Sequence, residues 1–216
     1  MITEENTIKI TATFSDDRKH RYSLRREWGN GDTAKTATII MSNASRADLT
    51  RGDLTSLLVQ NNLSALGYSS VTCVNLFSFM CQKLDLLKDV NVAELTNEDN
   101  EKQIVQAVKD ADICIVAIGT LSKTYKRARV YQDRLFSLLR EFQDKIHVIS
   151  APCGTEELHP LSGKLRADGS WTLTPYKLPD PAPVDNEDSN KKGKSKKNAK
   201  GNNQAKPDNV IPITSQ

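Results

Sequence analysis

The stretch KTATIIMSNAS, residues 35–45, joins an apolar run directly to four small, mostly polar residues. The β-branched residues of 35–41 favour a strand, and their apolar character favours one that is buried on both faces. After it come Ser42, Asn43, Ala44 and Ser45, whose small side chains let a ligand approach the backbone. In α/β sheets, ligands bind beyond the carboxyl ends of the strands. The stretch therefore predicts a core strand that ends at a binding site.

Further strands alternate with amphipathic helices along the chain. Apolar residues at helical spacing predict helices over 53–67, 97–111 and about 127–143. Apolar runs predict strands at 71–79, 112–119 and 145–152, after an N-terminal β-hairpin of 6–14 and 20–28. Thr96 and Asp99 resemble a capping box for the second helix. The predicted fold is α/β: a three-layer sandwich with a four-stranded parallel core sheet, whose edge the hairpin extends or covers.

The composition of the chain changes near residue 175. Pro175, Pro179, Pro181 and Pro183 follow one another closely, and a lysine-rich segment without aromatic residues comes after them. Such a segment cannot bury enough apolar surface to offset the entropy that ordering costs. We therefore predict a single α/β domain over 1–176 and a disordered, Lys-rich tail over 177–216. The lysines of this tail either keep it soluble or contact phosphates.

The overall composition excludes several classes of protein. The 216 residues carry a formal net charge of +3, which is too small to indicate nucleic acid by itself. No apolar run reaches the roughly 18 residues that cross a bilayer, and the N-terminus lacks the apolar segment of a secretory signal. A cytoplasmic protein without membrane contact is expected. The four cysteines and three histidines lack metal-ligand spacing, so neither a metal nor a cofactor is expected.

The ends of the other predicted strands also carry polar or small residues. Asn75 lies within the second strand, Gly119 and Thr120 end the third, and His159 follows the fourth. Parallel strands bring such positions to one edge of the sheet. Each position also fits a purely structural role, and the sequence leaves that alternative open. Asn75 is then a satisfied buried amide, Gly119 a turn, Thr120 a helix cap, and His159 a structural loop residue.

Charged residues surround the expected site. Asp48 and Asp53 either flank the cleft or place negative charge at a helix N-terminus. One of the arginines of 21–26 is expected to reach the cleft. Basic residues begin just after Thr120 and continue into the predicted helix at about 127–143, and this basic helix either contacts a nucleic-acid backbone or forms an ordinary solvated face. Its candidate residues are Lys123, Lys126, Arg127 and Arg129.

Short motifs occur in a fixed order over about residues 20–165. They are R-Y-x-L-x-R-x-W at 21–28, N-x-S at 43–45, D-x-T at 53–55, G-Y at 67–68, V-N-L-F at 74–77, D-N at 99–100, a strand ending at Gly119, and H-P-L at 159–161. In these motifs the chain resembles a bacterial, archaeal and phage domain family of unknown function, which has Asn-Pro-Ser, Asn-Leu-Phe and His-Pro-Leu motifs. That family in turn is remotely similar to the uracil-DNA glycosylase superfamily.

The resemblance implies roles for individual residues. Asn43 would position or activate a water, and His159 would hydrogen-bond a base carbonyl or stabilise a leaving anion, so these two are the catalytic candidates. The substrate-binding candidates are Ser45, Asn75, Phe77, Gly119 and Thr120. Ala44 stands where the family has proline, Ile118 stands where tryptophan is frequent, and no carboxylate occupies the water-activating position. Catalysis would therefore depend on positioning and on leaving-group stabilisation.

These observations predict a protein that binds nucleic acid, DNA above all, or a nucleotide. The leading hypothesis is a DNA glycosylase-like enzyme that cleaves the N-glycosidic bond of a modified or damaged base. The first alternative is a non-catalytic module that senses nucleic acid or a nucleotide through the same cleft. A weaker alternative is a protein-interaction domain. The sequence carries no indication of the oligomeric state.

Overall fold

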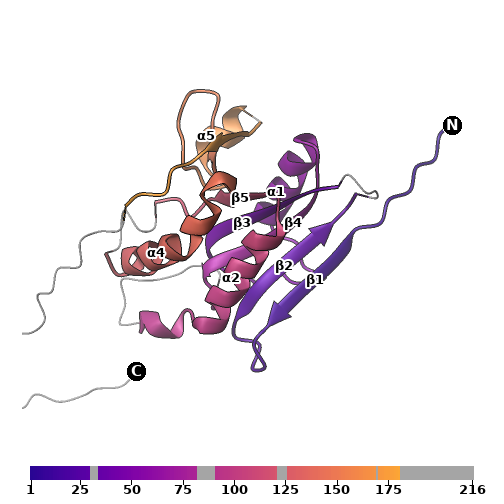
Figure 1. The fold of residues 1–216 in the computed structure, drawn as a ribbon. Coiled ribbons are helices and arrows are strands. Elements are labelled where there is room, and N and C mark those ends of the chain that lie inside the picture. The colour runs from indigo at the N-terminus through magenta and orange to yellow at the C-terminus, as the bar shows by residue number, and fades with distance from the viewer. Residues whose placement is uncertain (30–33, 82–90, 121–125, 169, 181–216) are drawn as a thin grey trace, which may run out of the picture. The chain divides into compact units, whose positions relative to one another are not determined.

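The structure, a computed structural model, describes residues 1–29, 34–81, 91–120, 126–168 and 170–180 (Figure 1). The strands are β1 (Lys9–Phe14), β2 (Arg21–Glu27), β3 (Lys35–Asn43), β4 (Tyr68–Phe77), β5 (Ile113–Val116), β6 (Ile146–Ser150) and β7 (Thr172–Pro175). The α-helices are α1 (Leu54–Ala65), α2 (Glu98–Asp110), α4 (Lys126–Leu139) and α5 (Gly163–Asp168). Two 3₁₀ helices, Val92–Glu94 and Arg140–Lys145, complete the described elements.

The strands form one seven-stranded sheet in the order β1-β2-β4-β3-β5-β6-β7. The inner strands β4, β3, β5 and β6 are parallel to one another, but β2 pairs with β4 and β7 pairs with β6 in antiparallel orientation. The sheet is therefore mixed, and the prediction of a four-stranded parallel sheet is corrected. The N-terminal hairpin extends one edge. At the other edge β7 was missed, because four residues ending in proline are a weak strand signal.

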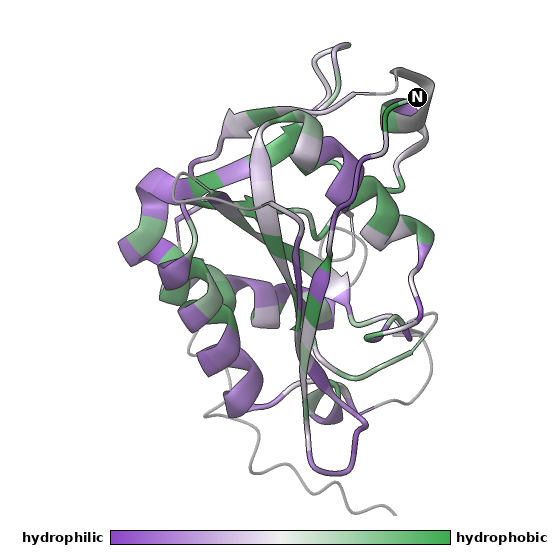
Figure 2. Cartoon of the chain, turned by 90° about the vertical axis from the view of Figure 1, so that its right-hand side faces the viewer, coloured by the Kyte–Doolittle hydropathy of each residue, from purple (hydrophilic) through white to green (hydrophobic). Residues whose placement is uncertain are grey.

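Helices cover both faces of the sheet, which confirms a mixed α/β architecture (Figures 1 and 2). Neighbouring residues of β3 point to opposite faces, as a pleated strand requires. Ile40 packs into the cluster that contains α2 and α4, whereas Ile39 packs into the one that contains α1 and α5. The central strand therefore contributes to two hydrophobic cores, and this explains its continuous apolar run.

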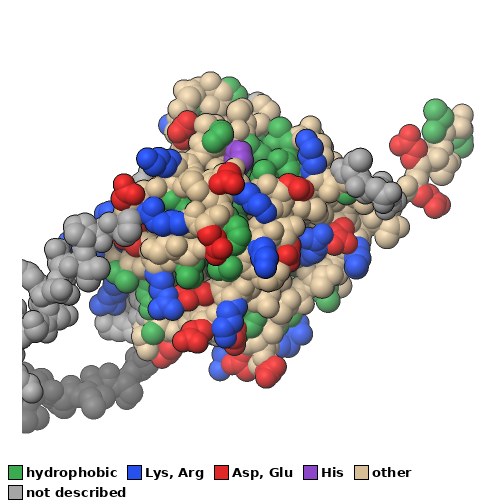
Figure 3. All heavy atoms as spheres, in the orientation of Figure 1, with side chains coloured by type: hydrophobic (Ala, Val, Ile, Leu, Met, Phe, Trp, Pro, Cys, Tyr) green, Lys and Arg blue, Asp and Glu red, His purple; other side chains and the backbone are tan. Residues whose placement is uncertain are grey.

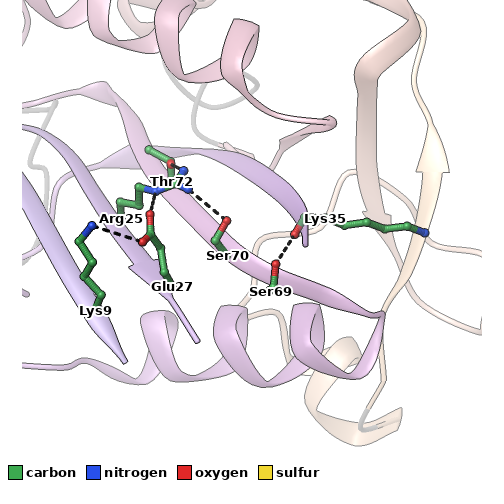
Figure 4. Close-up of polar contacts among 7 residues, drawn as sticks. All are labelled: Lys9, Arg25, Glu27, Lys35, Ser69, Ser70 and Thr72. Carbon is green, nitrogen blue, oxygen red and sulfur yellow. Dashed lines mark hydrogen bonds and ion pairs between the residues drawn. The ribbon is translucent and has the colours of Figure 1, made fainter. Parts of the chain in front are cut away.

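Polar side chains cross three strands on one face near the hairpin edge (Figure 4). Arg25 of β2 donates hydrogen bonds to Glu27 and to Thr72 Oγ1, the latter at 3.2 Å. Lys9 of β1 forms an ion pair with Glu27 at 3.7 Å. These contacts tie the antiparallel hairpin to β4, so the sheet continues beyond its parallel part without a break.

The second long helix begins differently from the expected capping box. The N-cap is Asn97, whose side-chain oxygen accepts the backbone N–H of Asn100 at 3.0 Å. Thr96 instead accepts the side-chain amide of Asn100 at 3.0 Å. Asn100 is fully buried and also donates to the backbone oxygens of Asn75 and Leu76. The helix start therefore fixes the end of β4.

The described chain stays packed beyond the predicted end of the domain at residue 176. Leu178 is 1% exposed and belongs to the core that contains α4. Its backbone N–H donates to the side chain of Gln143 at 3.0 Å, and Gln143 donates to the carbonyl of Tyr176 at 2.7 Å. The predicted tail beyond residue 180 lies outside the described residues. Among the residues that are described, no helix is long and apolar enough to cross a membrane.

Replacing Leu178 with alanine tests whether this last segment belongs to the domain. Loss of a fully buried leucine is expected to lower the free energy of unfolding by about 2–4 kcal/mol, because it leaves a cavity in the core. Urea denaturation followed by circular dichroism measures this change. Val130→Ala on α4 is the matched control, since Val130 is exposed and should change stability by less than about 0.5 kcal/mol. Equal midpoints for both variants would contradict the assignment.

Candidate functional site

A polar pocket of about 140 Å³ opens at the carboxyl end of β3. Five parts of the chain meet there: the start of β2, the end of β3 with the residues after it, the start of α1, the middle of β4 and the loop that follows β6. The predicted residues Asn43, Ser45 and His159 all line it. The other lining residues are Arg21, Met41, Ser42, Asp53, Thr55, Ser56, Cys73 and Leu161. Ser42 and Asn43 at the end of β3 and Ser45 just after it thus border a cavity, and ligand binding there stays a prediction.

Backbone hydrogen bonds fix the turn that carries Asn43 and Ser45. The N–H of Ala44 donates to the carbonyl of Phe77 at 3.0 Å, and the carbonyl of Ala44 accepts the N–H of Cys81 at 3.0 Å. Proline at this position could not make the first of these bonds, because it has no N–H. Asn43 donates to the Cys81 carbonyl at 3.3 Å and accepts the hydroxyl of Ser42 at 3.1 Å. With alanine at position 44, a backbone hydrogen bond restrains the turn that the ring of a proline would otherwise restrain.

Arg21 of β2 is the arginine that reaches the cleft. It is 2% exposed, and its guanidinium donates to the Ala47 carbonyl at 2.6 Å and to Asn75 Oδ1 at 3.3 Å. Burial lowers the pKa of Arg21 below its ordinary value, while the carboxylate of Asp53 opposes that shift. An arginine stays charged even so. Its Nε has no hydrogen-bond partner in the described part of the chain.

Asn75 and Phe77, both predicted to bind substrate, lie behind the pocket and do not line it. Asn75 is fully buried, and its side-chain oxygen accepts a hydrogen bond from Arg21. Its side-chain nitrogen has no partner among the described residues. Phe77 packs in the core, with its ring edge-on to that of Tyr131 at 5.6 Å between centroids. Asn75 thus reaches the pocket through Arg21, and Phe77 supports the strand end.

Asp53 supplies a carboxylate to the pocket, and it also caps α1. Its side chain accepts the backbone N–H of Ser56 at 2.7 Å, which is the N-cap interaction. Burial raises the pKa of Asp53, but hydrogen bonds from Ser45 and Ser56 and the charge of Arg21 outweigh burial and hold it below its ordinary value. Asp53 therefore has both expected roles: it flanks the cleft, and it places negative charge at the N-terminus of α1. Asp48, by contrast, is held in an exposed turn by hydrogen bonds from Thr50 and Arg51.

His159 is held by its own loop in one orientation. Its Nδ1 accepts the backbone N–H of Leu161 at 3.2 Å, so the neutral ring carries its hydrogen on Nε2. Burial lowers the pKa of His159, and the negative charge of Asp53 partly offsets this effect. The ring is therefore neutral at pH 7 and offers an N–H donor. Burial also raises the pKa of Cys73 in the same pocket to about 11, so that thiol stays protonated.

Gly119 has a packing role beside His159. Its φ of +71° lies in the left-handed region that favours glycine, and an added Cβ would lie 3.4 Å from the Cβ of His159. Gly119 also lines a separate cavity of about 30 Å³ beneath α4, with Gln132 and Tyr176 among its other walls. Thr120 is exposed and lines neither cavity. The end of β5 therefore shapes the position of the His159 loop.

The predicted basic residues lie apart from the pocket wall. Lys126, Arg127 and Arg129 are exposed at the start of α4, and none of them lines the pocket. Arg129 forms an ion pair with Asp133 at 3.7 Å. Lys123 lies outside the described residues. Their contact with a nucleic-acid backbone stays a prediction.

The arrangement suits acid–base or hydrogen-bonding chemistry. Within residues 1–29, 34–81, 91–120, 126–168 and 170–180, no group of three or more His, Cys, Asp or Glu residues could hold a metal ion. The pocket instead brings together an ionised carboxylate, a neutral imidazole and a buried guanidinium. Sequence reasoning left Asp53 outside the catalytic pair, although the D-x-T motif that includes it was the available signal.

The fold and pocket define a three-layer α/β domain with a polar site at the carboxyl edge of its sheet. The model of the family described as "Protein of unknown function (DUF1643)" matches residues 21–161, and the chain belongs to this family. The matched range begins at Arg21 and ends at Leu161, which both line the pocket. Membership in a family of unknown function is thereby confirmed, while the remote similarity to uracil-DNA glycosylases stays a prediction.

Curated proteins and solved structures add little to the family match. No relative was found among curated proteins. Among solved structures, a protein from Agrobacterium vitis S4 that is provisionally named a hydrolase aligns with 13% sequence identity and a TM-score of 0.33. The alignment covers 81% of this chain and 70% of that protein. A likeness at this score carries no argument about fold or function.

Substitution of Asp53 tests its electrostatic contact with His159. In Asp53→Asn the pKa of His159 should fall further below its ordinary value of 6.5, because the negative charge that favours the imidazolium is gone. NMR titration of the histidine ring protons measures this shift, with His159→Gln assigning the signal. Asp48→Asn is the matched control, and His20 is an internal reference. An unchanged His159 titration in Asp53→Asn would contradict the described geometry.

Proposed function

We propose that the pocket binds a nucleobase and that the protein hydrolyses its N-glycosidic bond. The observation that carries this proposal is the convergence of Asn43, Asp53 and His159 in one pocket at the carboxyl edge of the sheet, with Arg21 as its buried charge. Hydrogen-bonding groups on several walls suit a planar ligand with donors and acceptors along its edges. The motif resemblance to a family related to uracil-DNA glycosylases supports the same reaction.

The proposed reaction needs a base for water and a donor for the departing nucleobase. Asp53 is ionised at neutral pH and would accept a proton from water as the water oxygen attacks C1′ of the sugar. The C1′–N bond breaks, and its electron pair leaves with the nucleobase. His159 would donate a hydrogen bond from its Nε2–H to the nucleobase, which leaves as an anion that this bond stabilises. Asn43 would orient the water through its side-chain oxygen, since its nitrogen already binds the Cys81 carbonyl.

The segment between Ser45 and Asp53 supports a nucleic acid as the source of the base. Arg46 and Arg51 on this segment are both exposed, and neither forms an ion pair with any described residue. A chain whose base enters the pocket would bring its phosphates toward this segment. Arginine is suited to phosphate contacts because its donors form a rigid fork.

Base release is the direct test of this proposal. The purified protein is incubated with oligonucleotides that carry uracil or other altered bases, and alkali then cleaves any abasic sites. We expect strand breaks for at least one base, reduced by about 10²- to 10⁴-fold in Asp53→Asn, which removes the base for water, and in His159→Gln, which removes the imidazole N–H that stabilises the leaving nucleobase. Asp48→Asn should retain the activity of the parent protein.

Two outcomes would reject catalysis. No strand breaks with any base, or breaks that persist at the parent rate in both variants, would show that the pocket does not perform this reaction. If a salt-dependent mobility shift of the same oligonucleotides occurred without breaks, a non-catalytic nucleic-acid-sensing module would replace the enzyme as the better interpretation.

A further inference from the structure

A short turn between β3 and α1 carries two arginines at the edge of the pocket. Residues 46–52, called the 46–52 turn, run from the pocket residue Ser45 to the pocket residue Asp53. Arg46 and Arg51 are exposed, and neither forms an ion pair with any described residue. Their guanidinium groups are therefore available to an anionic ligand that reaches the pocket.

Hydrogen bonds hold the 46–52 turn in one shape. Oδ1 of Asp48 accepts the backbone N–H of Thr50 at 2.9 Å and that of Arg51 at 2.8 Å. The N–H of Asp48 donates to the carbonyl of Arg51 at 3.0 Å. Ala47 is 3% exposed, and its carbonyl accepts a hydrogen bond from Arg21 at 2.6 Å. Because the turn is already ordered, it loses little conformational entropy when it binds a ligand.

The two arginines lie at opposite ends of the turn, next to different walls of the pocket. Burial raises the pKa of Cys81, and the positive charge of Arg46 opposes this rise, which places Arg46 near Cys81. The carbonyl of Cys81 accepts the side-chain amide of Asn43, a pocket residue. Arg51 lies at the other end, two residues before Asp53. A ligand that crosses the mouth of the pocket along the turn would therefore meet one arginine on each side.

Arg26 of β2 adds a third positive charge beside the turn. A Cβ added to Gly52 would lie 3.8 Å from Nη2 of Arg26. Nη1 of Arg26 donates to Gln60 of α1 at 3.4 Å, and Arg26 forms no ion pair with a described residue. Asp48 is the acidic residue of the 46–52 turn, and backbone N–H groups already bind its carboxylate. Positive charge therefore exceeds negative charge along this part of the surface.

Two arginines of α4 show the contrasting, paired arrangement. Arg134 pairs with Glu101 of α2 at 2.7 Å, and Arg129 pairs with Asp133 at 3.7 Å. Figure 3 shows Lys and Arg side chains intermingled with Asp and Glu over the face that it presents, rather than gathered in one basic area. Excess positive charge is therefore a local feature of the 46–52 turn, and the turn lies beside the pocket.

An apolar side chain stands between the two arginines. Leu49 is 48% exposed and belongs to neither hydrophobic core. Nucleic acids offer apolar base faces next to their phosphates, and leucine is among the side chains that pack against them. An acidic peptide or an inorganic phosphate would engage the arginines but leave Leu49 in water. The combination of Leu49 with Arg46 and Arg51 therefore favours a nucleic acid.

We propose that the 46–52 turn binds the backbone of a polynucleotide strand, with Arg46 and Arg51 on phosphates at the two sides of the nucleotide that enters the pocket and Leu49 against the neighbouring base. This inference rests on the proposed function for the group that enters the pocket. It names the substrate as a strand rather than a free nucleoside or nucleotide. A free nucleotide has a phosphate on one side and would engage one of the two arginines.

The salt dependence of binding tests the proposal. Fluorescence anisotropy measures the Kd of the full chain for fluorescein-labelled oligothymidylate over a range of KCl concentrations. For a single strand, log K falls with log salt by about 0.7 for each phosphate that is neutralised. Arg46→Gln and Arg51→Gln should each reduce this slope by about 0.7, and the double variant by about 1.4. Lys109→Gln in the last turn of α2 is the matched control, since it removes one exposed positive charge elsewhere and should leave the slope unchanged.

Two further measurements test the apolar contact and the need for a strand. Leu49→Ser should weaken binding by about 5- to 10-fold at every salt concentration with an unchanged slope, because it removes apolar area and no charge. Thymidine monophosphate should displace oligothymidylate only at a nucleotide concentration at least about 10²-fold higher, since it lacks the second contact. Circular dichroism checks that each variant is folded, as expected for exposed positions.

Several results would overturn the proposal. They are absence of binding at low salt, a parental slope in the double arginine variant, an equal loss of slope in Lys109→Gln, and parental affinity in Leu49→Ser. Equal competition by polyglutamate or by thymidine monophosphate would overturn it as well, because charge alone or a single nucleotide would then suffice.

The outcome can be separated from that of the proposed reaction, because binding needs no turnover. If the parent protein shows the expected slopes but releases no base, the reaction is rejected and the strand-binding turn stands. If oligonucleotides lose a base at the parent rate in the double arginine variant, the reaction stands and the strand-binding turn is rejected.

Discussion

The buried guanidinium of Arg21 is the interaction on which the candidate site depends. The Arg21 side chain is charged and only 2% exposed, so it needs nearby dipoles and an opposite charge. Without them the loss of hydration would strongly destabilise the folded state. Arg21 binds the carbonyl of Ala47 in the turn after β3 and the side chain of Asn75 in β4. The negative charge of Asp53 completes the compensation. One side chain from the hairpin thus interacts with β4, with the turn after β3 and with the first turn of α1.

The same interaction explains why residues with different sequence signals belong together. Asn75 orients Arg21, Arg21 holds the turn that carries Ser45, and the hydroxyl of Ser45 binds Asp53. Asp53 then raises the pKa of His159 against the effect of burial. Removal of any one link would leave a buried polar group without its partner. The pocket residues are therefore connected by hydrogen bonds and, between Asp53 and His159, by an electrostatic interaction.

The sequence predicted the parts of the fold that long, apolar patterns determine. The runs at 35–41 and 112–119 predicted core strands, since a sheet covered on both faces buries such runs. The strands found there are Lys35–Asn43 and the shorter Ile113–Val116, which ends before the predicted residue 119. Leu178 was missed because it lies within a proline-rich stretch, and its backbone N–H donates to the side chain of Gln143, a long-range contact that no local pattern reveals. β7 was missed for the same reason, as its antiparallel pairing with β6 is a long-range contact.

The candidate site was partly predictable for a related reason. Asn43 and His159 could be placed together because parallel strands bring their carboxyl ends to one edge. The proximity of Asp53 and Arg21 could not be predicted from the parallel strands. Asp53 looks like an ordinary helix cap in sequence, and Arg21 lies on an antiparallel strand whose position in the sheet no motif specifies. Their proximity is set by the pairing of β2 with β4.

The four small residues Ser42 to Ser45, which end β3 and follow it, have separate reasons to be small. Ala44 is fully buried between the carbonyl of Phe77 and the N–H of Cys81, so a larger side chain would displace the turn. Ser45 must reach both Arg21 and Asp53 from a short side chain. Ser42 and Asn43 bind each other at the pocket wall. Hence the abrupt change from β-branched to small residues marks the end of the buried part of β3. Beyond this point the side chains form hydrogen bonds at the wall of the pocket.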